Sequence, residues 1–513
     1  MSSPKFARTD AHTNRSIWSS GEPAQLVPLE RNEECEVCVV GAGIAGLTIS
    51  YFLAREGKSV IVLDKASAGQ GETINTSAHL SNAIDAGYRD IERYHGEHGA
   101  KLAAESHTAA IAAIETIVRN ESINCDFTRT DGYLFLDPSD SSKVLKDEFE
   151  AARRAGVEVE VSHKPPIPAA NDSCLRFPNQ AKFHAGKYIQ GLAAAAKKAG
   201  VKIYTGTEVG EVQGGEPARV MTNRGSSVAA LFAVVASNTP FNDRIAMHTK
   251  QAAYRTYMIG VPAPSAAIYD ALYWDTADPF HYVRLAKTVD RRDLLLIGGE
   301  DHKTGQTEEI EGCFTRLLSW GRAHFGELGD PEFRWSGQIM NSADGLAFIG
   351  RNPGNPNIFI VTGDSGVGLT HGTIAGILIT DLIQGRNNPW ETLYDPSRKM
   401  IRAAVEFTRE NLNTAAQYAD WLTAGEVADP REIEPGSGAI LREGFTKIAA
   451  YRDDSGALHR CSAVCPHLGG IVAWNSVESS WDCPCHGSRF DPYGKVLNGP
   501  AAVPLKAAPP TAA

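Results

Sequence analysis

The chain has 513 residues, enough for three domains, and contains 50 Lys and Arg against 61 Asp and Glu. The resulting net charge of −11 argues against nucleic acid or an anionic membrane surface as the main partner. No stretch approaches the roughly twenty apolar residues of a transmembrane helix, and the first thirty residues lack an apolar signal core. These features predict a cytoplasmic protein with no membrane span, and the nine cysteines show no paired framework, as expected in a reducing compartment.

A strand, turn and helix pattern near the N-terminus predicts a nucleotide-binding unit. Residues 37–40 form an apolar run typical of a buried parallel strand, and the motif G-x-G-x-x-G follows directly. Gly41 allows the tight turn, Gly43 lets the backbone approach a pyrophosphate, and Gly46 lets the following helix pack on the strand. We expect that helix over residues 44–55, with its N-terminus facing the phosphates.

A second strand strengthens this interpretation. Residues 59–63 are mostly apolar and are followed by Asp64, an acid at a distance from the glycines that suits a ribose hydroxyl pair. The pattern does not by itself separate NAD from FAD, and an ordinary glycine-rich turn is the alternative to a nucleotide site.

Five later segments bear on the choice of cofactor, namely residues 72–80, 234–240, 335–338, 344–350 and 363–372. They resemble the FAD-dependent amino acid and amine oxidoreductases related to glycine oxidase, sarcosine oxidase and D-amino acid oxidase, and the resemblance covers about residues 34–390. It implies FAD as the cofactor. It also implies an α/β fold in which a Rossmann-like FAD-binding domain is interleaved with an antiparallel-sheet substrate domain.

The same resemblance implies which residues contact FAD. The last of the five segments would lie at the flavin ring, with a helix N-terminus near the ring carbonyl. The expected FAD-contacting residues are Gly41, Gly43, Gly46, Asp64, Thr73, Ser77, His79, Val209, Gly345, Gly363, Gly366, Gly368, Leu369 and Thr370.

The mode of flavin attachment is a separate question. Some relatives attach flavin covalently to a His in the loop that corresponds to the one containing His79, but a hydrogen-bonded His near the cofactor is the favoured interpretation here. No Cys lies in residues 363–372 or close after them. Covalent attachment of the sarcosine oxidase kind is therefore not expected.

The substrate site is expected on the antiparallel sheet, where the related enzymes often hold a substrate carboxylate with Arg or Tyr. The candidates are Tyr257, Tyr282 and Arg284, and strand alternation would place Tyr282 and Arg284 on one face. An ordinary surface Arg with a core Tyr is the alternative. Residues 294–299 are apolar where sarcosine oxidases place a Lys over the flavin, which weakens the oxidase interpretation.

Apolar residues recur at helical spacing over about residues 397–422, among them Ile401, Val405 and Leu412. We expect a long, partly amphipathic helix that spans the FAD-dependent domain and leads to a small domain of short strands. The predicted organisation is an N-terminal extension (1–33), an FAD-dependent domain (34–390), a helical linker (391–432) and a small β domain (433–513). FAD-binding segments are expected at about 34–90, 181–240 and 340–390, and substrate-domain segments at about 91–180 and 241–339.

Two cysteine and histidine motifs near the C-terminus predict a metal centre. Cys465-Pro466-His467 is followed, after about fifteen residues, by Cys483-Pro484-Cys485-His486. A Rieske [2Fe-2S] centre needs this division because one iron takes two Cys sulfurs and the other takes two His nitrogens. The motifs resemble those of the Rieske family over roughly the last eighty residues, which implies Cys465, His467, Cys483 and His486 as ligands. A zinc site also uses two Cys and two His, but the one-residue gap in the first motif is unlike usual finger spacing.

The chain departs from the respiratory, high-potential branch of the Rieske family at two positions. Gly470 replaces a Cys of that branch, so Cys485 lacks the usual disulfide partner, and Phe490 replaces a Tyr. Ser488 is able to donate to a cluster sulfur, and residues 498–501 are expected to cover the cluster from a third side. The lost hydrogen bond and disulfide predict a reduction potential in the lower half of the Rieske range of about −150 to +300 mV.

Together these features resemble a bacterial group of FAD-dependent oxidoreductases with a C-terminal Rieske domain. We expect a dehydrogenase that oxidises a carbon–nitrogen bond of a small amine or amino acid and passes single electrons through the cluster to an external acceptor, such as a protein. A reductase with electrons entering through the cluster, and a non-enzymatic redox sensor, remain alternatives. A Rieske oxygenase is disfavoured because no D-x-x-H-x-x-x-x-H motif is present, and NAD(P)H oxidation because no second G-x-G-x-x-G is visible.

Overall fold

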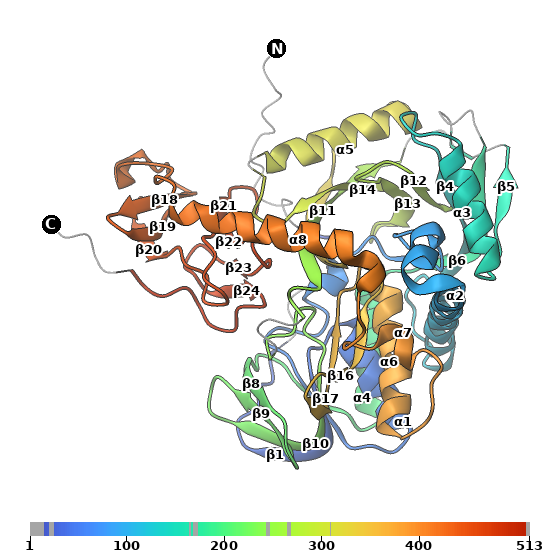
Figure 1. Cartoon of the computed structure of the whole chain (residues 1–513), viewed down its shortest axis with the longest axis horizontal. Helices are drawn as coiled ribbons and strands as arrows, with labels where there is room; N and C mark the ends of the chain where they lie inside the picture. The colour runs from blue at the N-terminus through green and yellow to red at the C-terminus, as the bar shows by residue number, and fades with distance from the viewer. Residues whose placement is uncertain are drawn as a thin grey trace.

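The computed structural model describes residues 15–19, 25–163, 166–167, 173–242, 247–263, 268–307 and 309–508. The predicted N-terminal extension lies partly outside these ranges. Figure 1 shows a large body built on two sheets and a small β domain at one end, connected by helix α8 (Ala404–Ala416). The predicted fold class, an interleaved α/β region followed by a small β domain, is confirmed. The domain boundaries stay predictions.

The first sheet carries the N-terminal motif and is mainly parallel. Its strand order is β16-β17-β10-β1-β2-β7, and β9 and β8 extend it beside β10. β1 pairs in parallel with both β2 and β10, as in an open nucleotide-binding sheet. The strands are β1 (Glu33–Val40), β2 (Val60–Leu63), β7 (Lys202–Tyr204), β8 (Val209–Gln213), β9 (Ala218–Thr222), β10 (Ser227–Val235), β16 (Phe348–Asn352) and β17 (Asn355–Thr362).

Helices packed on this sheet form the largest apolar core. The helix predicted over residues 44–55 is observed as α1 (Ile44–Arg55). Its Leu47, Ile49 and Leu53 are fully buried, and α1 packs against α4 and α6. The other helices of the body are α2 (Tyr88–Asn120), α3 (Lys143–Arg154), α4 (Ala185–Lys198), α6 (Gly368–Ile383) and α7 (Glu391–Tyr394), with a 3₁₀ turn η1 (Glu72–Ile74).

The second sheet is mainly antiparallel and is apolar on both faces. Its order is β15-β11-β14-β13-β12-β4-β6-β3, with β5 beside β6. Leu295 and Ile297 of β14 pack toward helix α5 (Ile310–Phe325), whereas Leu294 and Leu296 pack into the core of the first sheet. The strands are β3 (His79–Leu80), β4 (Thr128–Phe135), β5 (Glu160–Ser162), β6 (Cys174–Lys182), β11 (Gln251–Pro262), β12 (Leu272–Asp275), β13 (Tyr282–Lys287), β14 (Asp293–Lys303) and β15 (Phe333–Ser342).

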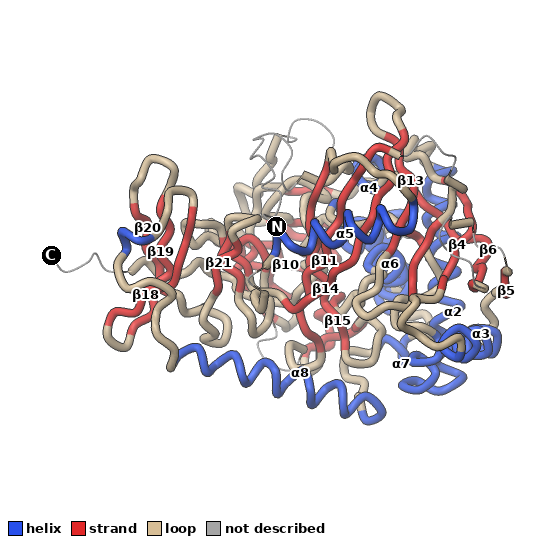
Figure 2. Tube along the Cα trace, turned by 90° about the horizontal axis from the view of Figure 1, so that it is seen from above, coloured by secondary structure: helices blue, strands red, loops and turns tan. Residues whose placement is uncertain are grey.

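The helical stretch that leaves the body agrees with the predicted position but not with the predicted character. It consists of η2 (Ile401–Ala403), α8 and η3 (Gln417–Trp421). The recurring apolar residues of the predicted, partly amphipathic helix do not form a buried face, because Ile401 and Val405 are each 76% exposed and Leu412 is 66% exposed. Figure 2 shows α8 running along the outside of the molecule toward the small domain.

Polar contacts hold α8 in place instead. Glu410 pairs with Lys303 at 2.6 Å and accepts the Tyr254 hydroxyl at 3.2 Å, which fixes the helix to the second sheet. Further along, the Tyr418 hydroxyl donates to the carbonyl oxygen of Leu468 in the small domain at 2.8 Å. The linker is therefore bound at both ends.

The small C-terminal domain consists of two sheets around its own core. The core contains Trp481 and Phe490, both fully buried, beside Cys465 and Cys483. One sheet has the order β18-β19-β20 and the other the order β21-β22-β23-β24. After a short turn η4 (Pro430–Glu432), the strands are β18 (Ser437–Glu443), β19 (Thr446–Arg452), β20 (Leu458–Ser462), β21 (Ala473–Asn475), β22 (Ser480–Asp482), β23 (Arg489–Phe490) and β24 (Val496–Asn498).

A buried ion cluster joins this domain to the second sheet. Glu478 lies in the turn between β21 and β22, and the Arg255 Nη2 of β11 donates to both its carboxylate oxygens, at 2.6 and 2.7 Å. Arg489 of β23 pairs with the same carboxylate and, at 2.9 Å, with Asp482. Burial opposes ionisation of Asp482, yet the neighbouring Arg489 and Arg255 hold its pKa below the ordinary value. The side chains of Arg255, Glu478 and Arg489 are 3, 9 and 8% exposed, so loss of Glu478 would leave Arg255 buried without its acidic partner and Arg489 with Asp482 alone.

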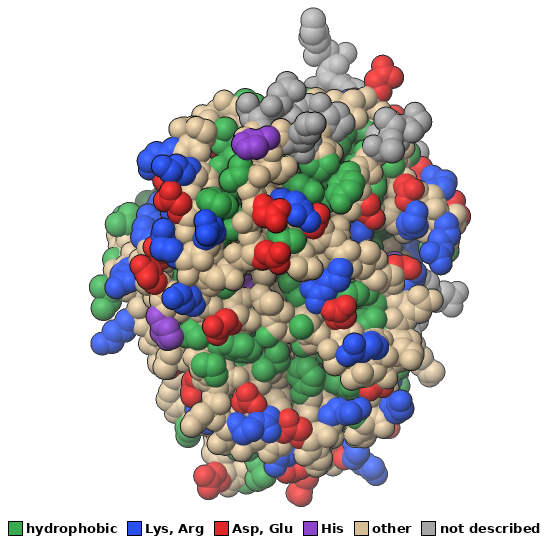
Figure 3. All heavy atoms as spheres, turned by 90° about the vertical axis from the view of Figure 1, so that its right-hand side faces the viewer, with side chains coloured by type: hydrophobic (Ala, Val, Ile, Leu, Met, Phe, Trp, Pro, Cys, Tyr) green, Lys and Arg blue, Asp and Glu red, His purple; other side chains and the backbone are tan. Residues whose placement is uncertain are grey.

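Within the described ranges, no helix is long and apolar enough to cross a lipid bilayer. On the face shown in Figure 3, Lys and Arg side chains are interspersed with Asp and Glu. Charges of both signs are therefore mixed on that face.

Replacing Glu478 with Gln removes the charge that Arg255 and Arg489 share. Both guanidinium groups would remain buried with a weaker partner, so we expect the free energy of unfolding to fall by about 3 kcal/mol. Differential scanning calorimetry would show this as a lower melting temperature. The matched control is Glu443→Gln, because Glu443 is 41% exposed beside Arg460 and its loss should cost less than about 1 kcal/mol. Equal melting temperatures for the two variants would contradict the role given to the buried cluster.

Candidate cofactor site

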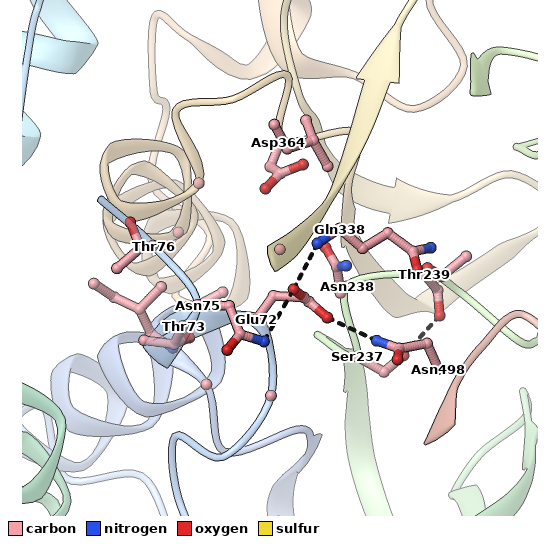
Figure 4. A pocket seen from close by; sticks show the side chains of 18 of the residues that line it. Glu72, Thr73, Asn75, Thr76, Ser237, Asn238, Thr239, Gln338, Asp364 and Asn498 are labelled. Atoms are coloured by element: carbon pink, nitrogen blue, oxygen red, sulfur yellow. Dashed lines mark hydrogen bonds between the residues drawn. The ribbon is translucent and has the colours of Figure 1, made fainter. Parts of the chain in front are cut away.

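A cavity of about 610 Å³ lies where the two sheets and the C-terminal domain meet. The glycine turn after β1 and the start of α6 line it, as do residues of β11, β13 and β15. The C-terminal domain adds residues 496–499, 501 and 502 to the lining. Figure 4 shows Thr73, Asp364, Gln338 and Asn498 around this one space, although they come from four distant segments.

The glycine turn brings the backbone next to the cavity. Gly41 has a φ of +109°, and a Cβ there would lie 2.4 Å from the carbonyl oxygen of Ala236. A Cβ on Gly46 would lie 1.9 Å from the Gly41 carbonyl oxygen, so α1 packs on the turn only when this residue is Gly. Gly43 is the N-cap of α1 and lines the cavity. The N-terminus of α1 therefore faces the cavity, as binding of a pyrophosphate requires.

Asp64 follows β2 and fixes the same turn. Its Oδ2 accepts a hydrogen bond from the Ala42 N–H at 2.6 Å, and its Oδ1 accepts one from the Ala66 N–H at 2.7 Å. Burial raises the pKa of this carboxyl above its ordinary value. Each carboxylate oxygen retains a second lone pair, so Asp64 can also accept hydrogen bonds from ribose hydroxyls in the cavity.

Glu72 connects three segments around the cavity (Figure 4). Its carboxylate accepts the Gln338 backbone N–H at 2.7 Å, the Asn498 side-chain amide at 2.8 Å and the Asn75 side-chain amide at 3.4 Å. The loop expected near the flavin is thus tied to β15 and to the C-terminal domain. Docking of that domain completes the wall of the cavity.

Most residues expected to contact FAD line this cavity, and three do not. Gly46 lies beneath the turn, as described above. Gly345 and Gly363 have φ values of +77° and +71° and permit turns behind the wall, where a Cβ would approach Ala86 and Phe348. The lining residues are Gly41, Gly43, Asp64, Thr73, Ser77, His79, Val209, Gly366, Gly368, Leu369 and Thr370. Their contacts with FAD stay predictions.

Two acids that were not among the predicted site residues, Asp85 and Asp364, lie beside the segment that leads into α6. Gly366 has a φ of +81°, and a Cβ there would lie 2.0 Å from the Asp85 Oδ2. Asp364 accepts the Met340 N–H at 2.9 Å, and burial raises the pKa of this carboxyl to about 7. Asp85 and Asp364 both line the cavity. Asp364 lies in the segment 363–372 that was expected at the flavin ring, but Asp85 lies in no predicted motif, so spacing along the chain does not indicate that the two acids share one cavity.

Tyr282 and His79 lie together on the cavity wall. The Tyr282 hydroxyl shares a hydrogen bond with the Thr256 hydroxyl at 2.7 Å, and the Tyr282 and His79 rings meet edge to face at 5.9 Å. Burial lowers the pKa of His79 to about 3, so its imidazole is neutral. Its Nε2 is buried and has no partner among the described protein atoms. A polar group in the cavity would supply that partner.

Tyr257, predicted to hold a substrate carboxylate, faces away from the cavity. Its ring stacks on His302 with 5.3 Å between centroids and packs against Phe314 of α5. Tyr257, Ile259 and Val261 alternate onto the face of β11 that packs against α5, whereas the neighbouring Thr256 lines the cavity. This prediction is wrong because Tyr257 belongs to the opposite face of the sheet.

Arg284, the other predicted carboxylate ligand, is buried outside the cavity. The Cζ of its guanidinium lies 5.3 Å from the centroid of the Trp18 ring. The guanidinium donates to backbone carbonyl oxygens at 2.6 to 3.3 Å, those of Ser77, Ala78, Phe183 and Leu285. These contacts use the donors that a carboxylate would need, which contradicts the predicted role.

Two loops of the C-terminal domain hold the predicted cluster ligands in the same way. The Cys465 N–H donates to the Gly470 carbonyl oxygen at 2.8 Å, and the Gly469 N–H donates to the Cys465 carbonyl oxygen at 3.0 Å. In the second loop the Cys483 N–H donates to the Ser488 carbonyl oxygen at 2.8 Å, and the Gly487 N–H donates to the Cys483 carbonyl oxygen at 3.0 Å. Each cysteine is therefore fixed at the start of a tight loop.

The four predicted ligands lie next to one another. The rings of His467 and His486 meet edge to face with 5.0 Å between centroids, and the side chains of Cys465 and Cys483 are in contact. The Ser488 hydroxyl reaches Cys465, as predicted. No three His, Cys, Asp or Glu side chains of the described chain surround a single ion position. Two thiols and two imidazoles on paired loops are the donors that a [2Fe-2S] cluster with two ligands at each iron requires.

The histidine side of this site faces the large body. His248, 3% exposed, lies 4.6 Å from His467 and 6.0 Å from His486 between ring centroids. The loop predicted to cover the cluster also lies here, because the Ala501 N–H donates to the Ser488 hydroxyl at 3.0 Å. That loop lines the cavity on its other side.

Comparison with known proteins agrees with this geometry. A family model described as FAD dependent oxidoreductase matches residues 36–382, more than half of the chain. The chain belongs to this family. A Rieske [2Fe-2S] domain model matches residues 423–509, which contain all four predicted cluster ligands. FAD and a [2Fe-2S] cluster are therefore the cofactors of this oxidoreductase.

Individual relatives share either the whole chain or its larger part. The chain is 30% identical to the putative Rieske 2Fe-2S iron-sulfur protein YhfW of Bacillus subtilis over 99% of both chains. It is 26% identical to gamma-glutamylputrescine oxidoreductase of Escherichia coli, over 72% of this chain and 88% of that protein. Its structure is similar to glycine oxidase from Geobacillus kaustophilus, with a TM-score of 0.60 and 19% identity over 72% of this chain and 99% of that chain. The last likeness shows the fold.

Gly470→Cys should restore the disulfide of the high-potential Rieske branch. A Cβ at Gly470 would lie 3.3 Å from the Cys485 Cβ and 2.5 Å from its Sγ, which is near the separation of about 3.5 to 4.5 Å between bridged Cβ atoms. We expect the variant to form this bond and its cluster potential to rise. Thiol labelling and an EPR-monitored redox titration measure the two effects. The control Gly470→Cys with Cys485→Ser should keep a lower potential, and a free Cys485 thiol in the oxidised single variant would contradict the prediction.

Proposed function

We propose that this oxidoreductase is a dehydrogenase that oxidises a carbon–nitrogen bond of a small amine or amino acid and releases the electrons through its Rieske domain to an external acceptor. FAD supplies hydride chemistry and the Rieske cluster supplies single-electron exchange. The chain itself positions the substrate, excludes water and keeps the two cofactor sites together.

The observation that carries this proposal is the wall shared by the two cofactor sites. Residues 498–501 contact the second cluster loop through Ser488, and part of the same segment lines the cavity. His248 of the body packs against both histidine ligands, His467 and His486. This arrangement supports electron exchange within one chain. The cytoplasmic location and the identity of the external acceptor stay predictions.

The charges of the cavity wall favour an amine over an amino acid. Arg255 and Arg489 line the cavity, but both pair with the carboxylate of Glu478, which reduces their capacity to bind a substrate carboxylate. Asp85 and Asp364 present carboxyl groups to the same space. An ammonium group would complement these acids, so we propose a cationic amine as the substrate class.

Anaerobic mixing of the holoprotein with a panel of amines and amino acids tests the proposal. We expect at least one amine to bleach the flavin absorbance and the EPR signal of the reduced cluster to follow. A panel in which no compound reduces the flavin, while a chemically reduced cluster passes electrons into it, would overturn the proposal. The wall that the two cofactor sites share is compatible with electron flow in either direction. Electron flow from the cluster to the flavin alone would favour a reductase.

Asp85→Asn tests the binding of a cationic substrate. Burial raises the pKa of Asp85 to about 7, and a bound ammonium group would favour its ionised form. The change preserves the size of the side chain but removes that carboxylate, and a hydrogen bond to a charged group contributes about 1.5 to 3 kcal/mol. We expect flavin reduction by the active amine at low concentration to slow by about tenfold or more. Reduction by dithionite should be unchanged. The control is Asp90→Asn, because Asp90 is a half-buried acid in the first turn of α2 that does not line the cavity. An equal loss in both variants would refute a specific role for Asp85.

A further inference from the structure

One side chain links the cavity directly to the second cluster loop. Gln338 of β15 is 2% exposed and lines the cavity. Its Nε2 donates to the carbonyl oxygen of Gly487 at 3.0 Å. Gly487 directly follows His486, a predicted iron ligand. The other contact of Nε2 is the sulfur of Met340 at 3.7 Å.

The orientation of this amide follows from its partner. The Gly487 carbonyl can only accept a hydrogen bond, so the NH₂ group of Gln338 must face the cluster loop and its Oε1 must point elsewhere. That Oε1 is buried and has no partner among the described protein atoms. Leaving a buried acceptor without a donor costs about 1 to 3 kcal/mol, which a donor in the cavity would offset.

The contact is close because the cluster loop has no side chain at this point. Gly487 has a φ of +77°, and a Cβ there would lie 2.2 Å from the Cβ of Ala253 and 2.6 Å from the Gln338 Nε2. The second cluster loop can therefore contact the wall of the cavity only because residue 487 is a glycine and has no side chain. Gln306 offers a comparison, because its Nε2 donates to the Pro484 carbonyl of the same loop at 3.1 Å but it does not line the cavity.

We propose that Gln338 is the positioning residue that couples the two redox sites, with its Oε1 accepting a hydrogen bond from bound FAD while its Nε2 holds the cluster loop at Gly487. An amide that accepts a hydrogen bond at oxygen becomes a stronger donor at nitrogen, because connected hydrogen bonds polarise one another. A change of charge or protonation on FAD therefore alters the hydrogen bond to the loop that carries His486. By linkage, the state of the cluster affects FAD to the same extent.

This inference rests on the proposed exchange of electrons between FAD and the cluster, and goes beyond it by naming the residue that makes the two sites interdependent. Hydrogen bonds near a Rieske cluster tune its electronic properties, so the coupling should be visible in the EPR spectrum of the reduced cluster. Gln338 transfers no electrons and forms no bond to substrate. Its role is to transmit the state of one cofactor site to the other.

The test is a mediated dithionite titration of the holoprotein, with absorbance following FAD and EPR following the cluster. Samples are poised with the cluster reduced and FAD either oxidised or reduced. In the wild-type protein we expect the g values of the cluster to shift when FAD becomes reduced. In Gln338→Met, which keeps the length of the side chain and removes both hydrogen-bonding groups, we expect that shift to be lost.

Two further variants separate coupling from packing. Gln306→Met removes a side-chain amide from the same cluster loop outside the cavity and should keep the full shift. Gln338→Asn retains an amide too short to join the cavity to Gly487 and should lose the shift, which covers the case in which the Met variant fails to fold. FAD content and melting temperature are measured for each protein.

Three results would overturn the assignment: no shift in the wild-type protein, a full shift in both Gln338 variants, or an equal loss in Gln306→Met. The titration uses a chemical reductant. Failure of the amine panel would therefore leave this result intact, and failure here would leave amine oxidation intact.

Discussion

The fused architecture depends on the buried carboxylate of Glu478, which is shared between Arg255 of the flavoprotein body and Arg489 of the Rieske domain. Removing these charges from water is costly, and their attraction offsets that cost only when docking brings all of them together. A shifted docking position would leave a buried guanidinium or carboxylate without a partner. The ion cluster therefore specifies one relative placement of the two domains, in addition to any stability it adds.

Packing requires the same placement. A Cβ at Gly487 would collide with Ala253 of the body, and a Cβ at Gly305 would lie 2.9 Å from the Asp482 carbonyl oxygen of the Rieske domain. The docked position also lets Asn498 donate to Glu72 and so completes the cavity. Charge pairing, steric fit and closure of the FAD site are thus satisfied together, and none of them is compatible with a sliding interface.

The sequence predicted those features whose geometry is set by short spacing along the chain. The turn and helix that follow β1, the acid Asp64 and the two cluster loops are of this kind. Tyr257 was misplaced because the pattern of β11 does not show which of its two faces turns to the cavity, and Tyr257 lies on the face that packs against α5. Glu478 lies in no motif, and the segment 335–338 did not indicate a role for Gln338 at the cluster loop, because both roles arise from contacts between residues 149 and 223 positions apart. Such contacts depend on how complete domains pack, which spacing does not report.

The linker binds the Rieske domain against the flavoprotein body, where that domain forms part of the cavity wall. The thirteen residues of α8 span about 20 Å. Apolar side chains of this helix, Val405 and Leu412, face solvent, and polar side chains bind the helix to the two domains. Thr414 donates to the Cys485 carbonyl at 3.4 Å, and Tyr418 supports the first cluster loop. A flexible tether would give only a millimolar effective concentration of cluster at the flavin site. With the helix bound at both ends and the interface docked, the two cofactor sites are adjacent in the folded chain, so little further entropy is lost in bringing them together.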